Sequence, residues 1–340
     1  MRQTDVLIVG AGLAGCALGL LLRRAGMDVL IAEAREACGK DKLCGGALTQ
    51  GACSLLTDFY GEEVLGELRT RRTDWMVRHT FEASVRMPFV FHVLPRARLD
   101  AYCLRRYQEE GGCLADGTRF VDVDRDAQVA TFRDARTGEK SRIRYRTLVG
   151  ADGAGSAVRR VICGRFPRTT IALQGIAPRA SGVAADEVVS DQRMDEHGTC
   201  WYIPHEVGAV VGCLFHHKDG AYARERLDGF CAMLGIPVPD LRGAPIPTGD
   251  DVLLGVGADT WFAGDAAGLI KPSTGAGIDY ALHSAQTLAE ALLGGTPYDE
   301  AMASVVQHVR SEAARGEKNN ALACLHIALA ASRSAAVRPR

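Results

Sequence analysis

The chain opens with two apolar runs that flank a helix-like segment. Residues 4–10 (TDVLIVG) and 27–33 (MDVLIAE) are almost wholly apolar and rich in β-branched side chains, which is typical of buried strands. Between them, residues 13–26 are rich in alanine and leucine and end at Gly26, a pattern that predicts a helix closed by glycine. A strand, a helix and a strand in this order predict a parallel βαβ unit.

The rest of the chain mixes helical and strand-like patterns. Helices are expected at residues 50–70, 99–111, 222–234, 276–293 and 298–332. Strands are expected at 73–79 and 84–91, as a hairpin, and at 118–123, 129–133, 141–150 and 260–263. Alternating apolar stretches over 168–215 predict an antiparallel sheet, and the prolines of 236–250 predict a crossing segment.

Composition excludes several classes of protein. With 47% hydrophobic residues, 24% charged residues and a net charge of -1, the chain is typical of a globular protein that does not bind nucleic acid. The 11 cysteines form no paired spacing, which argues against a disulfide framework and against a zinc or other metal site. Because residues 6–10 run directly into Gly-x-Gly, we expect a first strand rather than a signal peptide, and no apolar run is long enough to span a membrane. The cytoplasm is the expected location.

The first motif is GAGLAG at residues 10–15. Gly10 permits a tight turn, Gly12 lets the backbone approach a pyrophosphate, and Gly15 lets the helix pack on the strand. The pyrophosphate would bind at the helix N-terminus, beside Ala14, because free N–H groups and the helix dipole favour an anion. Glu33 ends the second strand, where its carboxylate can bind the adenosine ribose and would repel a 2′-phosphate. The unit therefore predicts FAD or NAD rather than NADP, with Ala34 and Arg35 beside the same ligand.

Two later motifs favour FAD. LVGADGAGS at residues 148–156 leads to Arg159, and WFAGDAAG at 261–268 leads to a Pro-x-x-Gly-x-Gly loop. They resemble the DG and GD fingerprints of the para-hydroxybenzoate hydroxylase-like flavoproteins. The resemblance implies that Asp265 binds the ribityl chain and that the loop lies beside the flavin pyrimidine ring, where a helix N-terminus can stabilise negative charge. It also implies that Arg96 lies near the FAD phosphates and that Asp152 orders the loop under the pyrophosphate. The other residues that it assigns to the cofactor are Gly153, Gly264, Pro272, Gly275, Gly277 and Ile278.

A fourth motif indicates which family among these flavoproteins the chain resembles. Residues 42–47 (KLCGGA) resemble the Cys-Gly-Gly segment of the geranylgeranyl reductase family, and CWYIP at 200–204 is similar to its W-x-F-P sequence. The chain departs from that sequence at Thr199, Ile203 and His205. Members reduce carbon–carbon double bonds of polyprenyl chains with FAD, so the resemblance implies an apolar substrate and a two-electron transfer through flavin N5. It places Gly45 and Gly46 near the flavin, with Cys44, Trp201 and His205 as candidate catalytic residues.

The resemblance also implies an α/β fold in which a Rossmann-like FAD-binding domain carries an inserted antiparallel substrate domain. The FAD-binding domain would comprise residues 1–70, 93–165 and 251–296. The substrate domain would comprise the hairpin 71–92 and the sheet 166–250, and 297–340 would form a C-terminal helical segment.

Each candidate residue has a second interpretation. Cys44 is either a proton donor or gate at the flavin, or a small buried side chain. Trp201 either walls a substrate tunnel or packs the sheet, and His205 is either a general acid or a structural residue. W-x-I-P also resembles part of the W-x-W-x-I-P sequence of flavin halogenases, for which Lys42 would be the early lysine. Aromatic hydroxylation is the main alternative activity, followed by halogenation and by a redox sensor that acts through a partner.

The electron donor and the C-terminus complete the expectations. No second dinucleotide fingerprint is present, so electrons are expected from NAD(P)H or from a reduced carrier protein. Residues 321–331 (ALACLHIALAA) are apolar on nearly all sides, and Arg333, Arg338 and Arg340 follow. This segment is either an interfacial helix, which would bring peripheral contact with a membrane, or a helix docked on protein.

Overall fold

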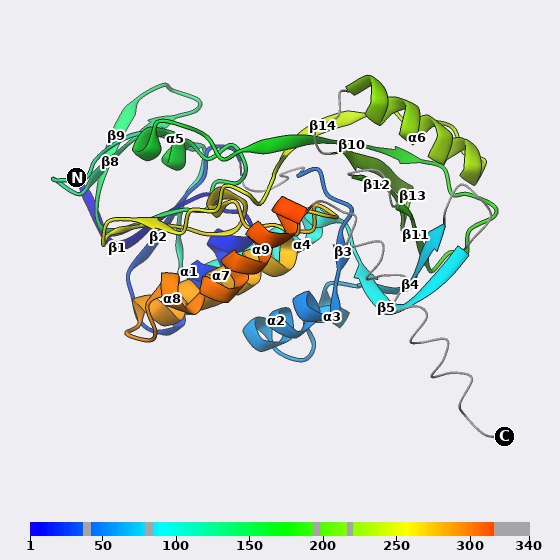
Figure 1. Ribbon diagram of the computed structural model, residues 1–340. Coiled ribbons are helices and arrows are strands. Elements are labelled where there is room, and N and C mark those ends of the chain that lie inside the picture. Colours follow the sequence, from blue (N-terminus) through cyan, green and yellow to red (C-terminus); the bar gives the residue numbers. More distant parts are fainter. Residues whose placement is uncertain (37–41, 79–83, 193–197, 216–219, 316–340) are drawn as a thin grey trace.

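Two β-sheets organise the molecule (Figure 1). The computed structural model describes residues 1–36, 42–78, 84–192, 198–215 and 220–315. Within these residues the first sheet runs through parallel strands in the order β16 (Thr260–Phe262), β9 (Lys140–Gly150), β1 (Arg2–Val9), β2 (Val29–Ala32) and β6 (Cys113–Ala115). Antiparallel strands β15 (Gly255–Val256), β8 (Val129–Asp134) and β7 (Thr118–Asp124) extend it. The predicted βαβ unit is therefore confirmed.

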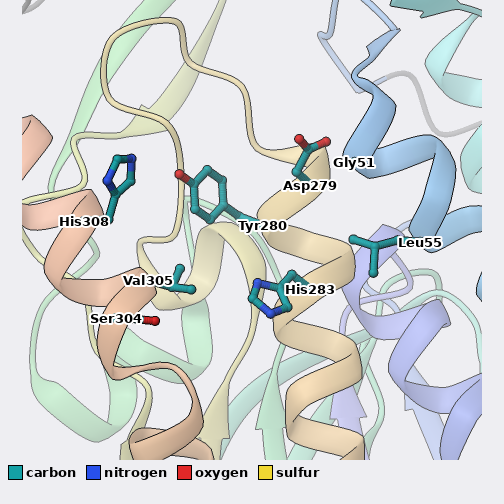
Figure 2. A pocket seen from close by; sticks show the side chains of 8 residues that line it. All are labelled: Gly51, Leu55, Asp279, Tyr280, His283, Ser304, Val305 and His308. Carbon is teal, nitrogen blue, oxygen red and sulfur yellow. The ribbon is translucent and has the colours of Figure 1, made fainter.

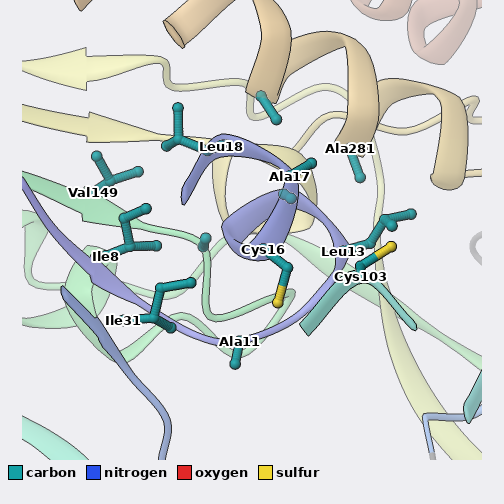
Figure 3. Close-up of a cluster of buried hydrophobic side chains, with 14 of the residues drawn as sticks. Ile8, Ala11, Leu13, Cys16, Ala17, Leu18, Ile31, Cys103, Val149 and Ala281 are labelled. Atoms are coloured by element: carbon teal, nitrogen blue, oxygen red, sulfur yellow. The ribbon is translucent and has the colours of Figure 1, made fainter. Parts of the chain in front are cut away.

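Helix α1 (Leu13–Arg24) forms the centre of the core beside this sheet. Figure 3 shows Cys16, Ala17 and Leu18 of α1 among side chains from β1, β2, β9 and α7 (Ile278–Leu292). Helix α4 (Arg96–Glu109) also contacts α1. Because α1 is covered on several sides, most of its residues are buried, which explains why its sequence is apolar with little periodicity.

The second sheet is mostly antiparallel, as the alternation over 168–215 predicts. Its order is β14 (Arg242–Pro247), β10 (Thr169–Ala177), β13 (Gly208–Phe215), β12 (Gly198–His205), β11 (Glu187–Gln192), β4 (Arg71–Arg78), β5 (Ser84–Val93) and β3 (Ala47–Leu48). The hairpin of β4 and β5 is confirmed. One pairing differs from the expectation, because β11 joins the hairpin through a parallel contact with β4.

The crossing segment predicted over 236–250 contains a strand. Residues 242–247 form β14, which pairs with β10 at the edge of the sheet. Pro245 and Pro247 fit in this strand because an edge strand tolerates residues that cannot donate to a neighbour. The strand that contains Pro245 and Pro247 is therefore the last strand at one edge of the sheet.

The two faces of the second sheet have different surroundings. Helix α6 (Gly220–Leu234) covers one face, where Leu227 and Phe230 pack against Val189, Tyr202 and Val211 (Figure 1). The opposite face carries the alternate side chains of the same strands, including Val188, Ile203 and Val210.

The remaining helices are short, and some differ from the sequence pattern. The helix expected over 50–70 is divided into α2 (Gln50–Tyr60) and α3 (Val64–Glu67), and α5 (Ala157–Cys163) follows the DG motif. The 3₁₀ helix η1 (Gly264–Ala267) follows β16. The single helix expected from residue 298 is α8 (Tyr298–Ala301) followed by α9 (Ala303–Arg315), and residues 316–340, with the apolar segment and basic tail, lie outside the described residues. No helix in the described part of the chain is long and apolar enough to cross a membrane.

Candidate functional site

Four of the predicted segments meet at one edge of the first sheet. Gly10 follows β1, Glu33 follows β2, Ala151 follows β9, and Ala263 follows β16. These strands are neighbours and parallel, so their carboxyl ends lie side by side. Ligands of open α/β sheets bind at this edge.

The glycines of the first motif are held by close backbone approaches. Gly10 has a φ of +108°, and a Cβ atom there would lie 2.5 Å from the carbonyl oxygen of Ala151. A Cβ atom at Gly15 would lie 2.0 Å from the carbonyl oxygen of Gly10. Among the described residues, a Cβ atom at Gly12 would meet nothing within 4 Å, and no side chain caps the N-terminus of α1. The free N–H groups of α1 therefore face a surface that fits an anionic ligand.

Glu33 joins the two loops at the ends of β1 and β2. Its side chain is buried and accepts hydrogen bonds from the backbone N–H groups of Ala11, at 2.8 Å, and Arg35, at 3.0 Å. Ala34 is half-buried and Arg35 is exposed. The predicted contact of Glu33 with a ribose stays a prediction, while its observed contacts fix the backbone around the same position.

Asp152 caps a helix. Its carboxylate accepts from Ser156 Oγ at 2.5 Å and from the backbone N–H of Ala157 at 2.6 Å, at the start of α5. Burial raises the pKa of Asp152, although these hydrogen bonds oppose the shift. The fully buried Arg159 donates to the carbonyl oxygens of Asp251 and Ala266, so the DG segment is tied directly to the GD segment.

The GD aspartate has a partner that sequence reasoning did not find. Asp265 Oδ2 lies 3.0 Å from Lys42 Nζ, so the lysine before Cys-Gly-Gly forms an ion pair with the GD motif. A Cβ atom at Gly277 would lie 3.1 Å from Asp265 Oδ1. Gly264 lies between α1 and α7, because its Cβ atom would meet Ala14 at 3.2 Å and Ala281 at 3.4 Å. All three fingerprints are therefore in mutual contact.

The Pro-x-x-Gly-x-Gly loop lies against the second sheet. The backbone N–H of Lys271 donates to the carbonyl oxygen of Ala276 at 2.9 Å and closes the loop just before α7. Pro272 and Ile278 are buried. A Cβ atom at Gly275 would lie 3.1 Å from Leu214 of β13 and 3.4 Å from Ile246 of β14.

The Cys-Gly-Gly segment makes a tight turn beside a buried ion pair. Gly46 has a φ of +69°, and a Cβ atom there would lie 1.9 Å from the carbonyl oxygen of Leu94. Cys44 is half-buried, and its Sγ accepts from the N–H of Gly46 at 3.4 Å and lies 4.0 Å from Arg96 NH1. Arg96 is buried and bonds to Asp100 at 2.9 Å. The Cys44 thiol therefore lies at the edge of the buried ion pair between Arg96 and Asp100.

His205 connects this turn to the second sheet. Its Nε2–H donates to the carbonyl oxygen of Gly45 at 2.9 Å, and burial lowers the pKa of the imidazole. Ile203, on the same face of β12, approaches Gly45 so closely that a Cβ atom there would lie 2.3 Å from Ile203 Cδ1. Cys44 and His205 are thus brought to the same turn.

Trp201 lies further along β12, on the same face as His205. Its ring covers Gly212 of β13, where a Cβ atom would lie 2.6 Å from Trp201 Cζ2. The indole N–H is buried without a hydrogen-bond partner in the part of the chain that the structure describes. The position of Trp201 therefore suits both interpretations, packing of the sheet and contact with a substrate.

This face of the second sheet is apolar, and we call it the apolar face. It touches the Cys-Gly-Gly turn through Ile203 and the Pro-x-x-Gly-x-Gly loop through Leu214, so both predicted flavin-contacting loops border it. Sequence reasoning found only Trp201, because the other members are brought together by strand pairing between distant segments. The apolar face comprises Ala47, Trp75, Phe91, Val93, Val188, Trp201, Ile203 and Val210, together with Leu214 on the same side of β13 as Val210.

A cavity of about 360 Å³ opens between α2, α7 and α9 (Figure 2). Asp279 lies at its rim and accepts from Thr49 Oγ1 at 2.5 Å, and burial raises the pKa of Asp279. None of its lining residues was a predicted site residue. They are Gly51, Leu55, Asp279, Tyr280, His283, Ser304, Val305 and His308.

Comparison with known proteins identifies the family. Residues 3–211 match the family described as "FAD binding domain". The chain belongs to the FAD binding domain family. It is 30% identical to the menaquinone reductase of Mycolicibacterium smegmatis, over 90% of this chain and 80% of the relative. It is 28% identical to the geranylgeranyl diphosphate reductase of Rhodobacter capsulatus, over 87% of this chain and 77% of the relative.

A solved structure shares the fold. The geranylgeranyl bacteriochlorophyll reductase-like protein of Thermoplasma acidophilum superposes with a TM-score of 0.75 at 21% identity, covering 96% of this chain and 88% of that chain. The fold class and the resemblance to geranylgeranyl reductases among the para-hydroxybenzoate hydroxylase-type proteins are confirmed. As a member of the FAD binding domain family, the chain is an FAD-binding oxidoreductase.

Proposed function

We propose that the protein reduces carbon–carbon double bonds in the prenyl chain of an apolar substrate. The observation that carries this proposal is the apolar face, which borders both the Cys44–Gly46 turn and the loop at Gly275. A prenyl chain is a long hydrocarbon, so an apolar surface beside the reacting centre would bind it and exclude water. The similarity to the two reductases supports the same activity.

The residues at the sheet edge fit FAD. The uncapped N-terminus of α1 beside Gly12 suits the pyrophosphate, and Glu33 suits the ribose. Asp265 and Gly277 would hold the ribityl chain and the flavin. When bound, FAD supplies two-electron transfer through flavin N5, and NAD(P)H or a reduced carrier protein would supply the electrons. The full proposed set is Gly10, Gly12, Ala14, Gly15, Glu33, Ala34, Arg35, Cys44, Gly45, Gly46, Arg96, Asp152, Gly153, Gly264, Asp265, Pro272, Gly275, Gly277 and Ile278.

Reduction of an alkene also requires a proton. In our proposal Cys44 donates it to the carbon that does not receive the hydride, so that one C–H bond forms at each end of the former double bond. Arg96 NH1, 4.0 Å from Sγ, would stabilise the thiolate that remains. His205 would hold the turn in place through Gly45, and Trp201 would position the chain.

The test uses holoenzyme reduced without oxygen and mixed with geranylgeranyl diphosphate or a short-chain menaquinone. Flavin absorbance follows reoxidation, and mass spectrometry follows saturation of the chain. Cys44→Ser should slow reoxidation roughly a hundredfold, because general-acid catalysis contributes about 10²–10⁴-fold. The matched control is Cys163→Ser, which replaces another half-buried free cysteine outside the proposed site.

Other activities would give different results. Oxygen uptake that rises with a phenol, without saturation of a prenyl chain, would establish a hydroxylase instead. Halide incorporation that depends on Lys42 would establish a halogenase. Equal rates for Cys44→Ser and wild type would remove Cys44 as the proton donor.

A further inference from the structure

Two arginines are fixed at the turn that joins β12 to β13. Arg71, at the start of β4, donates from NH2 to the carbonyl oxygen of Pro204 at 2.8 Å. Arg179, which follows β10, donates from NH2 to the carbonyl oxygen of His205 at 2.7 Å. The two acceptors are consecutive carbonyl groups at the end of β12, so both arginine side chains reach the same turn.

Among the residues that the structure describes, this arginine pair has no carboxylate partner. Neither Arg71 nor Arg179 forms an ion pair among the described residues, and the Nε–H of Arg71 is buried there without an acceptor. Burial and then the charge of Arg179 lower the pKa of Arg71, as expected for neighbouring cations. Of the acids that act on Arg71, Glu206 is bonded to Arg98 at 2.8 Å, and Asp186 is exposed.

An unsatisfied charged donor is unfavourable, and so is the approach of two cations. Burying a charged N–H group without an acceptor costs free energy, and a like charge nearby adds to that cost. An oxyanion that accepts from both guanidinium groups would remove both penalties. Guanidinium groups bind phosphate through paired N–H donors, so the residue type suits such a ligand.

The arginine pair lies at the end of the apolar face. Arg71 pairs with Val93 of β5, which in turn pairs with Ala47 of β3, so the three side chains share one side of the sheet. Val93 belongs to the apolar face, and Ala47 directly follows the Cys-Gly-Gly turn. A hydrocarbon chain on the apolar face could therefore end at Arg71 and Arg179.

We propose that Arg71 and Arg179 form a binding site for a phosphate or diphosphate group. In an elongated prenyl diphosphate the head group would bind the arginine pair, while the chain would extend along the apolar face towards the Cys-Gly-Gly turn. This assignment rests on the proposed function, because it specifies the substrate as a prenyl diphosphate. The same chemistry is present in the 2′-phosphate of NADPH, so the site could also serve an electron donor.

The test compares ligands that differ only in the phosphate. Calorimetry on holoenzyme measures binding of geranylgeranyl diphosphate, geranylgeraniol, inorganic pyrophosphate, NADPH and NADH. The double variant Arg71→Met and Arg179→Met should weaken binding of geranylgeranyl diphosphate and pyrophosphate roughly tenfold or more, and binding of geranylgeraniol less than twofold. Arg71→Lys keeps the positive charge and should weaken diphosphate binding less than the double variant does. Arg72→Met is the matched control, because Arg72 is the adjacent exposed arginine with its side chain on the opposite face.

The outcomes separate the two proposals. Unchanged pyrophosphate binding in the double variant overturns the anion site, as does equal weakening of the diphosphate and the alcohol. If the double variant weakens binding of NADPH but not of NADH or the prenyl diphosphate, the anion site is supported but its ligand is the electron donor. If wild type binds pyrophosphate through the arginine pair but binds and reduces no prenyl compound, the anion site stands and the proposed function fails. Circular dichroism and flavin content confirm that each variant is folded and loaded.

Discussion

The two sheets build their parts of the site in different ways. In the first sheet the candidate residues lie at the ends of adjacent parallel strands, and backbone contacts such as that between Gly10 and Ala151 set their positions. In the second sheet the candidate residues lie along one face, and strand pairing sets theirs, as when Trp201 is paired with Gly212. The first arrangement positions backbone N–H groups for a phosphate, whereas the second forms an apolar surface. A single chain can therefore vary its substrate on one sheet without disturbing the cofactor on the other.

The largest effect is expected from a substitution that disrupts packing at the first sheet and leaves the second sheet unchanged. Gly15→Val places a Cβ atom 2.0 Å from the carbonyl oxygen of Gly10, and neither backbone segment can move away easily. We expect a loss of roughly 4 kcal/mol or more in the free energy of unfolding, or insoluble protein. Chemical denaturation followed by circular dichroism measures it.

The matched control is Gly12→Val in the same loop. A Cβ atom at Gly12 meets nothing within 4 Å, so the apoprotein should keep its stability within about 1 kcal/mol. FAD affinity should fall roughly a hundredfold, because the new side chain projects towards the proposed pyrophosphate position. Equal stability loss in the two variants would contradict the distinction between packing and ligand approach.

The same difference between the sheets decides what the sequence could predict. Motifs such as residues 10–15 and 148–156 are contiguous, and their glycines and acids need only a strand and a helix beside them, so the FAD half of the fold follows from local patterns. The apolar face draws Trp75, Val188 and Val210 from three strands that are distant in the sequence. The ion pair of Lys42 with Asp265 and the arginine pair also join distant segments. No local spacing encodes these contacts, because they depend on strand order and register.

Asp251 stabilises the junction between the two sheets. It lies between β14 and β15, and it accepts from Arg159 at 2.7 Å and from Arg165 at 2.9 Å. Arg165 lies on the other segment that connects the two sheets, between α5 and β10. The two connecting segments also share a hydrogen bond, in which the backbone N–H of Thr248 donates to the carbonyl oxygen of Arg168 at 3.0 Å. Burial alone would raise the pKa of Asp251, but the hydrogen bond from Arg165 and the charge of Arg159 outweigh it, so the pKa lies below its ordinary value.

This depressed pKa predicts a pH dependence of stability. A carboxyl group of this kind stabilises the fold above its unfolded pKa, about 3.9, and the contribution disappears as the pH falls through the lower folded value. We expect Asp251→Asn to lose roughly 3 kcal/mol at pH 7, because the buried Arg159 keeps its carbonyl acceptors but loses its carboxylate partner. Below about pH 4 the difference in the free energy of unfolding between wild type and variant should become smaller. Urea unfolding between pH 7 and pH 2 measures it, with the exposed Asp58→Asn as control. A difference independent of pH would assign the loss to packing alone.

The smallest expected effect concerns the second sheet alone. Gly212→Ala places a Cβ atom 2.6 Å from Trp201 Cζ2 and 2.5 Å from the carbonyl oxygen of Leu173, so the indole ring must move. We expect a loss of about 2 kcal/mol in stability, because the backbone at Leu173 must also shift, with a changed tryptophan emission spectrum and weaker binding of prenyl substrates. FAD affinity should change less than twofold, since Gly212 lies on β13 and not at the edge of the first sheet.

The control for Gly212→Ala is Gly229→Ala in α6, where a Cβ atom meets nothing within 4 Å. This variant should be neutral or slightly stabilising, by about 0.5–1 kcal/mol, because alanine favours helix. If Gly212→Ala reduced FAD affinity as much as Gly12→Val, the cofactor and substrate halves would be coupled, and the separation argued from the two sheets would fail. If it altered substrate binding alone, the apolar face would be an independent determinant of which lipid the protein accepts.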